Sequence, residues 1–390
     1  MANAVLQDAI MLLALSVLAV ALLRRFHLPP IVGYLSVGVV AGPPVLGWLQ
    51  ESAATRSLGE IGVIFLLFTL GLELPLNQLK NMRGALLGLG GAQVLIGTLS
   101  GTAIAWALGI PVEGALIMGG ALAMSSTAIA TRQLMDQLEL QQRHGQLALA
   151  VLLFQDFAAV PFIVVIPILA TDGPLAAPLL LALVQAVAAF AIMLTLGRWG
   201  LRPLLREIAA SRAAELFTLT TLLIALTAAW ITHLLGLSLA LGAFLAGMLL
   251  AETEFRHQID SDIRPFRDVL LGLFFVTVGM QLDLARLAPA WGWVLLLLAG
   301  IVLGKGVLIA LLTRMAGYGP EVAARTGMVL AQGGEFGIAL VTLAVGAGLV
   351  SAGDTQPVLA ALILSMALAP VVVRHNARLA RLLPSRMSRG

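Results

Sequence analysis

The chain has 390 residues, of which 60% are hydrophobic and 11% are charged, and its formal net charge is +3. A mean hydropathy of +1.01 excludes a soluble domain of this length and predicts a polytopic membrane protein. There are no cysteines and the five histidines are scattered, so neither disulfides nor a resident metal site is expected. No cofactor is expected either, and the small basic excess lies in loops, where it indicates topology and not nucleic-acid binding.

Continuous apolar runs predict an all-α fold, because in lipid every backbone polar group must be satisfied within helices or closed barrels. The first run lacks a basic flank and a small-residue cleavage site, so it is interpreted as a real span. Thirteen transmembrane helices are predicted, at residues 4–23, 30–49, 57–74, 84–108, 113–133, 146–170, 177–199, 214–234, 237–251, 268–282, 289–313, 321–348 and 355–373.

Lysine and arginine residues are concentrated in alternate connections, and the opposite connections hold only Arg56 and Arg286. Because cytoplasmic loops carry the excess of basic residues, the basic side is predicted to be the cytoplasm. The chain is therefore expected in the cytoplasmic (inner) membrane, with its N-terminus outside and its C-terminus in the cytoplasm. Lys305 is the one cation that this assignment to the two sides leaves over, and it lies inside a span.

The chain also repeats itself. Residues 65–79 (FLLFTLGLELPLNQL) match residues 273–287 (LFFVTVGMQLDLARL) at an offset of 208, and residues 119–130 match residues 327–338 at the same offset. Spans 1–6 thus correspond to spans 8–13, with span 7 as a linker. Because a shift of seven spans is odd, the second copy enters the membrane from the opposite side. This pattern predicts the inverted-topology repeat of secondary transporters.

Gln155 and Asp156 form a polar pair in the middle of an apolar segment, residues 147–170. An ionised carboxylate at the bilayer centre costs at least about 2.5–3.5 kcal/mol on insertion scales, so it rarely lacks a use. A structural carboxylate paired to a neighbouring helix is one interpretation. We favour the other, in which Asp156 binds a cation or a proton and the neutral Gln155 supplies a carbonyl ligand without a second charge.

Polar or glycine-rich sequences interrupt two spans at matching points of the repeats, at residues 125–127 (SST) and 332–335 (QGGE). For the first sequence alone, an intact helix whose hydroxyls bond to the preceding turn is the alternative. Paired breaks instead predict crossed, discontinuous helices whose freed carbonyls can ligand a cation. The candidate ion-binding and crossover residues are Asp156, Gln155, Ser125, Ser126, Thr127, Gln332, Gly333 and Gly334.

Two further charged residues lie inside spans and are assigned to charge compensation. Glu335 is interpreted as neutralising half-helix N-termini or pairing with a cation, with ion transport as the alternative. Lys305 lies between Gly304 and Gly306, which leave room around it. An unpaired ammonium would be costly there, so a carboxylate partner is expected, either Asp156 or Glu335. Compensation of half-helix C-terminal dipoles is the alternative role for Lys305.

The motifs resemble those of the Kef-type potassium/proton antiporters, within monovalent cation:proton antiporter family 2, and the resemblance covers essentially the whole chain. It rests on AMSSTAIA (123–130), AVLLFQDFAAVP (150–161), FLLFTLGLEL (65–74), FRHQIDSDIRPF (255–266), LLGLFFVTVGMQLD (270–283) and LAQGGEFG (330–337), in this order and spacing.

The resemblance implies the sodium/proton antiporter-like fold, with elevator-type alternating access, and it places the ion-binding acid on Asp156 and the core lysine on Lys305. It implies a homodimer in membrane lipid, with K⁺ or Na⁺ and H⁺ as the transported ions. The implied domains are a scaffold in two parts (1–83 and 213–288), a core in two parts (84–170 and 289–374), a linker helix (171–212) and a basic cytoplasmic tail (375–390).

The longest polar connection, Glu252 to Asp268, carries dense charge of both signs and is interpreted as a solvated loop. A docking or gating surface is the alternative. The segment resembles the family's regulatory loop, which makes His257, Asp260 and Asp262 candidate regulatory residues. Kef-type proteins usually continue into a cytoplasmic nucleotide-binding domain, so a missing regulatory domain or a naturally short chain is expected.

The function expected from these features is secondary active exchange of a monovalent cation for H⁺, with K⁺ as the favoured cation and Asp156 as the shared site. A Na⁺/H⁺ antiporter and a channel-like K⁺ efflux pathway are the alternatives. An enzyme is not expected, because no paired aspartates, serine–histidine arrangement or zinc ligands suited to an intramembrane protease are recognisable in the spans.

Overall fold

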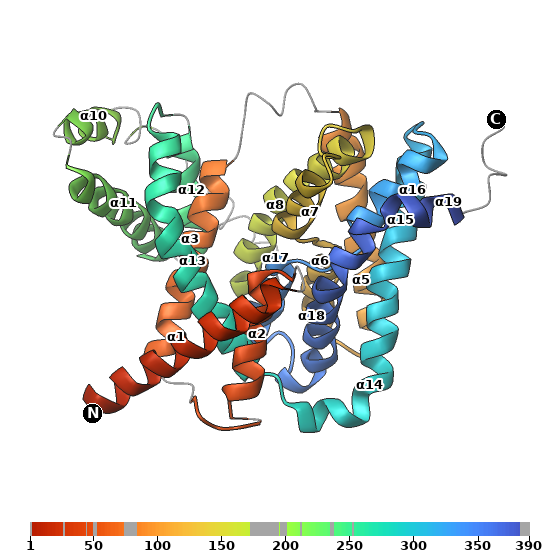
Figure 1. Ribbon diagram of the computed structural model, residues 1–390, viewed down its shortest axis with the longest axis horizontal. Helices are drawn as coiled ribbons and strands as arrows, with labels where there is room; N and C mark the ends of the chain where they lie inside the picture. Colours follow the sequence, from red (N-terminus) through yellow and green to blue (C-terminus); the bar gives the residue numbers. More distant parts are fainter. Residues whose placement is uncertain are drawn as a thin grey trace. The chain divides into compact units, whose positions relative to one another are not determined.

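The computed structural model describes residues 2–25, 28–43, 45–49, 53–73, 84–171, 195, 201–210, 213–234, 238–251 and 253–382. Its elements in these ranges are helices (Figure 1). They are α1 (Ala2–Arg24), α2 (Pro30–Ala41), α3 (Ala53–Glu73), the π-helical η1 (Gly84–Gly90), α5 (Gly91–Ala107), α6 (Val112–Ala123), α7 (Thr127–Asp136), α8 (Arg143–Leu169), α10 (Arg202–Ala210), α11 (Ala214–Leu234), α12 (Leu239–Ala251), α13 (Arg256–Met280), α14 (Leu284–Ala299), the π-helical η3 (Gly300–Lys305), α15 (Gly306–Met315), α16 (Pro320–Val329), α17 (Glu335–Gly346), α18 (Ala352–Arg374) and α19 (Asn376–Leu382).

Most helices follow the predicted spans closely, but α2 ends at Ala41 instead of 49, and α13 begins at Arg256 instead of 268. In the described part of the chain, six helical stretches are long and apolar enough to cross a membrane, and shorter apolar helices accompany them. The predicted span 5 is divided into α6 and α7, and span 12 into α16 and α17, so the prediction of two discontinuous helices is confirmed. Span 7 (177–199) lies almost wholly outside the described residues, and the total of thirteen stays a prediction.

One prediction about a connection is wrong. The segment interpreted as a solvated loop, Glu252 to Asp268, is helical from Arg256 onward and continues into α13 without interruption. Ile259 and Ile263 are both buried, one helical turn apart, and Asp260 pairs with Arg264 four residues on. The dense charge therefore forms the polar face of an amphipathic helix. His257, Asp260 and Asp262 all lie on this helix.

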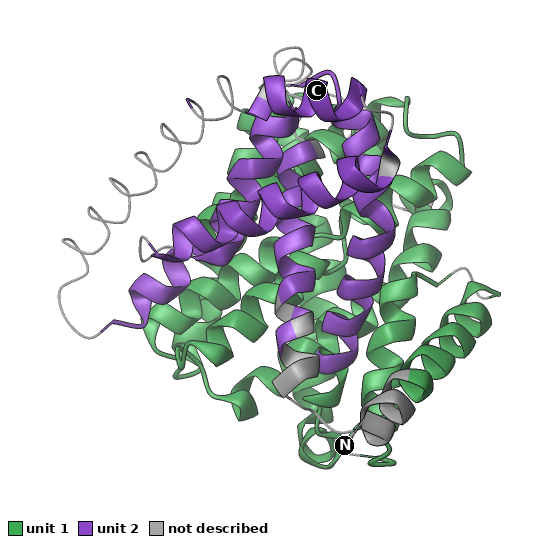
Figure 2. Ribbon diagram, turned by 90° about the vertical axis from the view of Figure 1, so that its left-hand side faces the viewer, with its two compact units in different colours: residues 1–50, 78–162, 278–390 green, residues 51–77, 163–277 purple. Residues whose placement is uncertain are grey.

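The chain forms two compact units, coloured separately in Figure 2. Unit 1 comprises residues 1–50, 78–162 and 278–390, and unit 2 comprises residues 51–77 and 163–277. Both breaks, Asp156 and Lys305 belong to unit 1. The division into scaffold and core parts predicted from the sequence is a statement about motion, and it stays a prediction.

Close helix contacts show the reciprocity expected of two related repeats. In unit 2, α3 and α12 meet at Gly71 and Gly247, where a Cβ on Gly71 would overlap the carbonyl oxygen of Phe244. In unit 1, α2 and the end of α13 meet at Gly38 and Gly279, where a Cβ on Gly279 would lie 3.0 Å from the Gly38 Cα. Gly71 and Gly279 are repeat equivalents at the offset of 208, and Gly38 and Gly247 match within one residue of that offset. Such an exchange of partners is what a two-fold relation produces.

Candidate ion-binding site

The crossover is formed by two short extended segments in unit 1. Residue Met124 has extended backbone angles, as does Ser126, which caps α7 by accepting the N–H of Ile129 at 3.3 Å. The Ser126 N–H donates to the Gly333 carbonyl oxygen at 3.1 Å, which joins the two breaks directly. A Cβ on Gly334 would lie 2.6 Å from the Ser125 carbonyl carbon, so only glycine permits this approach.

Asp156 lies on α8 and is only 5% exposed. The hydroxyl of Thr127, the first residue of α7, is 3.0 Å from both of its carboxylate oxygens and donates to them. The structure thus brings together the acid and the hydroxyl that the sequence placed in separate spans. A buried carboxylate beside a hydroxyl and unwound backbone offers oxygen atoms, which are suitable ligands for a hard cation and suitable acceptors for a proton.

Lys305 bonds to backbone carbonyls at the two helix breaks. Its ammonium donates to the Met124 carbonyl oxygen at 2.5 Å and to the Gln332 carbonyl oxygen at 2.9 Å. These carbonyls follow the C-terminal ends of α6 and α16, where the partial charge of the helix dipole is negative. Among the described residues Lys305 forms no ion pair, so the geometry matches dipole compensation and not the expected pairing with a carboxylate.

Glu335 is the first residue of α17 and is 7% exposed. An acid in the first turn of a helix interacts favourably with the positive end of its dipole. This place agrees with the interpretation that Glu335 neutralises a half-helix N-terminus. It stands directly after Gly334, so it is part of the crossover itself.

Gln155 precedes Asp156 on α8 and is 1% exposed. Its Oε1 accepts the Ser125 N–H at 2.7 Å, and its Nε2 donates to Oε1 of Gln93 at 2.7 Å. The amide oxygen that the sequence assigned to the ion therefore holds the crossover backbone in this structure. The Ser125 hydroxyl donates to the Leu330 carbonyl at 2.9 Å and ties α6 to α16.

Two residues of the site were missed by the sequence analysis. Gln93, on α5, is fully buried and donates to the Ala123 carbonyl at 3.1 Å. Ser365, on α18, accepts the N–H of Gly333 at 2.9 Å. Each is a polar residue within a predicted apolar span, and that position was the only signal available.

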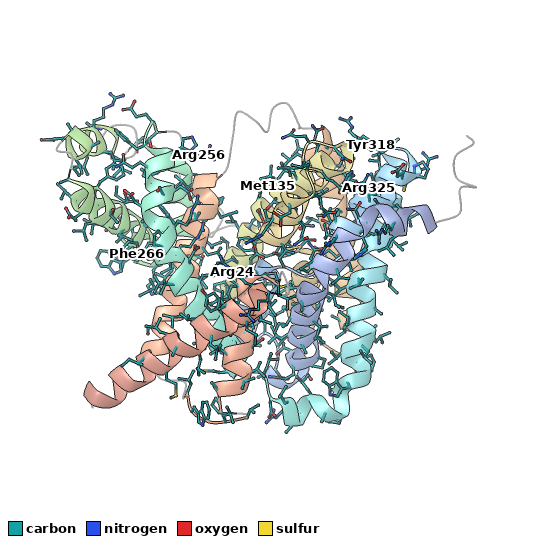
Figure 3. The ribbon with its side chains drawn as sticks, in the orientation of Figure 1. Arg24, Met135, Arg256, Phe266, Tyr318 and Arg325 are labelled. Atoms are coloured by element: carbon teal, nitrogen blue, oxygen red, sulfur yellow. The ribbon has the colours of Figure 1, made fainter. Side chains whose placement is uncertain are left out.

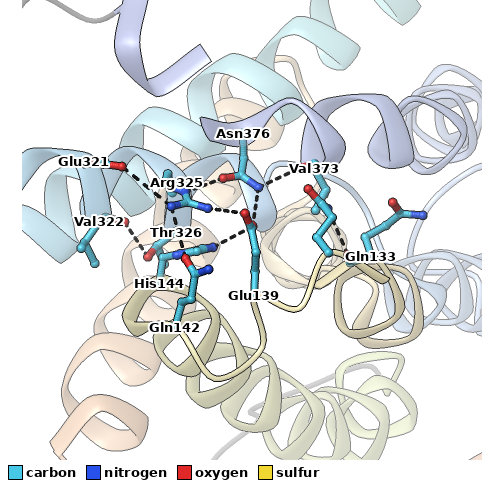
Figure 4. A network of polar contacts seen from close by, with 11 residues as sticks. Gln133, Glu139, Gln142, His144, Glu321, Val322, Arg325, Thr326, Val373 and Asn376 are labelled. Carbon is cyan, nitrogen blue, oxygen red and sulfur yellow. Dashed lines mark hydrogen bonds and ion pairs between the residues drawn. The ribbon is translucent and has the colours of Figure 1, made fainter. Parts of the chain in front are cut away.

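A second polar group, which we call the Arg325 cluster, lies in unit 1 outside the crossover (Figure 4). Arg325 of α16 pairs with Glu139 at 2.5 Å and donates to Asn376 at 2.6 Å. Asn376 and His144 contact the other carboxylate oxygen of Glu139, at 2.9 and 3.1 Å. The members of the cluster are Glu139, Gln142, His144, Glu321, Arg325 and Asn376.

The Arg325 cluster links the α7–α8 turn to α16 and to the start of α19. Burial raises the pKa of Glu139, but the hydrogen bonds from Asn376 and His144 and the charge of Arg325 outweigh it, so the pKa lies below its ordinary value. Next to the cluster, the Arg143 guanidinium lies 5.2 Å from the centre of the Tyr318 ring. Figure 3 places Tyr318 and Arg325 at the same end of unit 1.

Comparison with known proteins identifies the family of the chain and supports its fold. Residues 10–376 match the family described as sodium/hydrogen exchanger, transmembrane. The chain belongs to this family. Its fold resembles that of the sodium/proton antiporter MjNhaP1 of Methanocaldococcus jannaschii, with a TM-score of 0.70 at 17% identity over 98% of both chains. The prediction of an antiporter-like fold with crossed discontinuous helices is therefore confirmed.

Curated relatives of this family member support the Kef-type resemblance. The chain is 45% identical over 380 residues to the putative K⁺ efflux antiporter KefB of Alkalimonas amylolytica, covering 96% of this chain and 57% of that protein. It is 38% identical to the chloroplastic K⁺ efflux antiporter 1 of Arabidopsis thaliana, covering 94% of this chain and 32% of that protein. The chain thus spans about half or less of the length of these relatives.

Proposed function

We propose that this chain exchanges a monovalent cation, K⁺ in preference to Na⁺, for H⁺, with Asp156 as the shared binding site. The observation that carries the proposal is the buried carboxylate of Asp156 at a crossover of broken helices, 3.0 Å from the Thr127 hydroxyl. One carboxylate can hold a cation or a proton but not both, and this competition couples the two fluxes. The K⁺ preference is supported by the names of the curated relatives.

The mechanism proposed is alternating access of the elevator type. The segments 84–170 and 289–374 carry the ion as a moving core, and the segments 1–83 and 213–288 form a scaffold that also makes a homodimer. Gln155 carries no charge, so the proposed site contains a single carboxylate, that of Asp156, throughout the transport cycle. The chain lies in the cytoplasmic membrane with its N-terminus outside, and a regulatory domain acts on it where the protein continues further.

A regulatory role for the first turns of α13 belongs to the same proposal. His257 is exposed there, and Asp260 pairs with Arg264 on the same helix face. These residues therefore remain available, as part of a charged helix surface, to a domain outside the membrane. These residues belong to unit 2, whereas the crossover residues all belong to unit 1.

The test is exchange by purified protein in liposomes that hold a proton gradient. Addition of K⁺ should discharge the gradient at lower concentrations than Na⁺ or Li⁺, and the half-maximal concentration should rise as pH falls, because protons compete for Asp156. A cation flux that does not depend on the proton gradient would instead indicate a channel. A half-maximal concentration lower for Na⁺ than for K⁺ would indicate the sodium exchanger.

The variant that decides the role of the acid is Asp156→Asn, which keeps the size and polarity of the side chain but removes its charge. It should abolish exchange while leaving the protein folded and slightly more stable, since a buried charge is removed. Thermal melts recorded with and without each cation verify the fold and should show no cation-dependent stabilisation. Robust exchange by this variant would overturn the proposed function.

A further inference from the structure

A directed series of hydrogen bonds runs from the end of α6 through two glutamine side chains and back to the crossover. Gln93 Nε2 donates to the Ala123 carbonyl at 3.1 Å, Gln155 Nε2 donates to Gln93 Oε1 at 2.7 Å, and the Ser125 N–H donates to Gln155 Oε1 at 2.7 Å. Gln93, Gln155 and Ser125 are each only 0–2% exposed. We call this series the glutamine bridge.

The orientation of both amides in the glutamine bridge is fixed by its two ends. The Ser125 N–H can only donate, so Gln155 must turn its oxygen toward it and its nitrogen toward Gln93. Gln93 must then accept with its oxygen and donate with its nitrogen, and the Ala123 carbonyl can only accept. Flipping either amide would set like groups against each other at two places, so one arrangement satisfies every atom.

The glutamine bridge also explains how α6 can stop inside a membrane. Where the helix breaks after Ala123, the carbonyl of that residue and the N–H of Ser125 lose their helical partners. An unsatisfied backbone group in this setting costs several kcal/mol, and the two glutamines supply the missing partners. Gly97, on α5, allows this approach, because its Cβ would lie 3.3 Å from the Ala123 Cβ and 3.4 Å from Gln93 Nε2.

From this geometry we infer that Gln93 is a positioning residue for the ion site, which acts through Gln155 to set the cation preference. Gln155 is the neighbour of Asp156 on α8, and Ser125 lies two residues before Thr127, whose hydroxyl contacts Asp156. The glutamine bridge therefore sets the spacing between the carboxylate and the crossover oxygens. The inference rests on the proposed function and extends it to a residue on a third helix.

The glutamine bridge further accounts for a neutral residue at position 155. A carboxylate there could accept the Ser125 N–H, but its second oxygen would face the oxygen of Gln93. Gln93 would have to flip, which would turn its own oxygen against the Ala123 carbonyl and leave that carbonyl without a donor. Gln93 thus favours an uncharged side chain beside Asp156 and keeps the local site at one carboxylate.

The experiment compares Gln93→Leu, Gln93→Glu and wild type, all as the full chain in liposomes. The measured quantity is the ratio of half-maximal Na⁺ to K⁺ concentrations, recorded from pH 6 to pH 9. Leucine removes both hydrogen bonds of Gln93, the one it donates and the one it accepts, and the ratio should change about tenfold. A protonated glutamic acid can donate and accept like the amide, whereas its ionised form cannot donate.

Gln93→Glu should therefore match wild type at acidic pH and approach Gln93→Leu at alkaline pH. The matched control is Thr98→Val, also on α5, whose buried hydroxyl has no hydrogen-bond partner in the described part of the chain. This control should keep the wild-type ratio at every pH. If Gln93→Leu does not fold, the pH dependence of Gln93→Glu alone decides the matter.

Two results would overturn the inference about Gln93. One is a wild-type ratio at all pH values in both variants, and the other is a change in thermal stability without any change in the ratio, since a merely structural residue would behave so. Asp156→Asn separates the two levels of the proposal. If Asp156→Asn is inactive while the Gln93 variants keep the wild-type ratio, the inference about the glutamine bridge is wrong and the proposed function stands. If Asp156→Asn is active, the proposed function itself is wrong.

Discussion

The crossover and the Arg325 cluster both hold helices of unit 1 together, but they treat charge in opposite ways. In the Arg325 cluster, Arg325 pairs with Glu139 directly, so the two charges cancel. At the crossover, the Lys305 ammonium donates to two neutral carbonyls, and Thr127 offers a neutral hydroxyl to Asp156. A structural link between helices can thus pair its charges directly, whereas at the crossover the charge of Lys305 is held by neutral backbone carbonyls.

The largest effect is expected from breaking the Arg325 cluster. Arg325→Ala leaves the carboxylate of Glu139 mostly buried without its counter-charge, which should destabilise the protein by about 3 kcal/mol. Arg378→Ala is the matched control, because Arg378 is exposed on α19, and it should change stability by less than about 0.5 kcal/mol. Unfolding in detergent measures both, and equal stabilities for the two variants would contradict a role for the cluster in fastening the helices.

The second prediction concerns Lys305→Met, which disrupts the crossover and should reduce the exchange rate more than it reduces stability. Lys305→Met leaves the carbonyls of Met124 and Gln332 without their donor, at about 1–3 kcal/mol each, and removal of a buried charge offsets part of this. We expect a net loss of about 2 kcal/mol and an exchange rate at least about tenfold lower. Liposome exchange at matched protein content measures the rate, and a variant with full exchange would show that Lys305 is dispensable.

A smaller effect is expected in the pH dependence of stability, to which the Arg325 cluster contributes through Glu139. Because the pKa of Glu139 is lower in the folded protein than its ordinary value of 4.5, the stability it contributes is present above that value and is lost as pH falls through the folded pKa. Glu139→Gln should remove this dependence, so its stability should fall less than that of wild type between pH 7 and pH 4. Parallel melts of the two proteins at both pH values test this, and equal slopes would rule Glu139 out as the source.

The smallest effect concerns the glycines beside Lys305. A Cβ on Gly304 has nothing within 4 Å, so Gly304→Ala should change stability by no more than about 0.5 kcal/mol and leave exchange intact. A Cβ on Gly306 would lie 3.2 Å from the Ala331 Cβ, so Gly306→Ala should be the more harmful of the pair. Thermal melts rank the two variants, and the reverse order would contradict the close contact between position 306 and Ala331.

The sequence predicted the parts of the site that depend on local pattern. Asp156 and the two breaks were visible because polar residues interrupt apolar runs, and most span boundaries followed hydropathy. The partners were not visible, since Gln93 meets Gln155 across 62 positions, Lys305 meets Met124 across 181, and Arg325 meets Glu139 across 186. The start of α13 was misjudged for a related reason, because its charges were counted without the spacing of Ile259 and Ile263.

The reciprocal glycine contacts also determine when helices can pair during synthesis of the chain. Gly71 of α3 packs against Gly247 of α12, so α3 enters the membrane long before its partner exists. The ribosome must add roughly 180 residues in between, which takes on the order of ten to forty seconds. During that interval the glycine face of α3 must be covered by lipid or by the insertion machinery. Assembly of this protein is thus expected to finish late, when the helices of the second repeat become available to pair with those of the first.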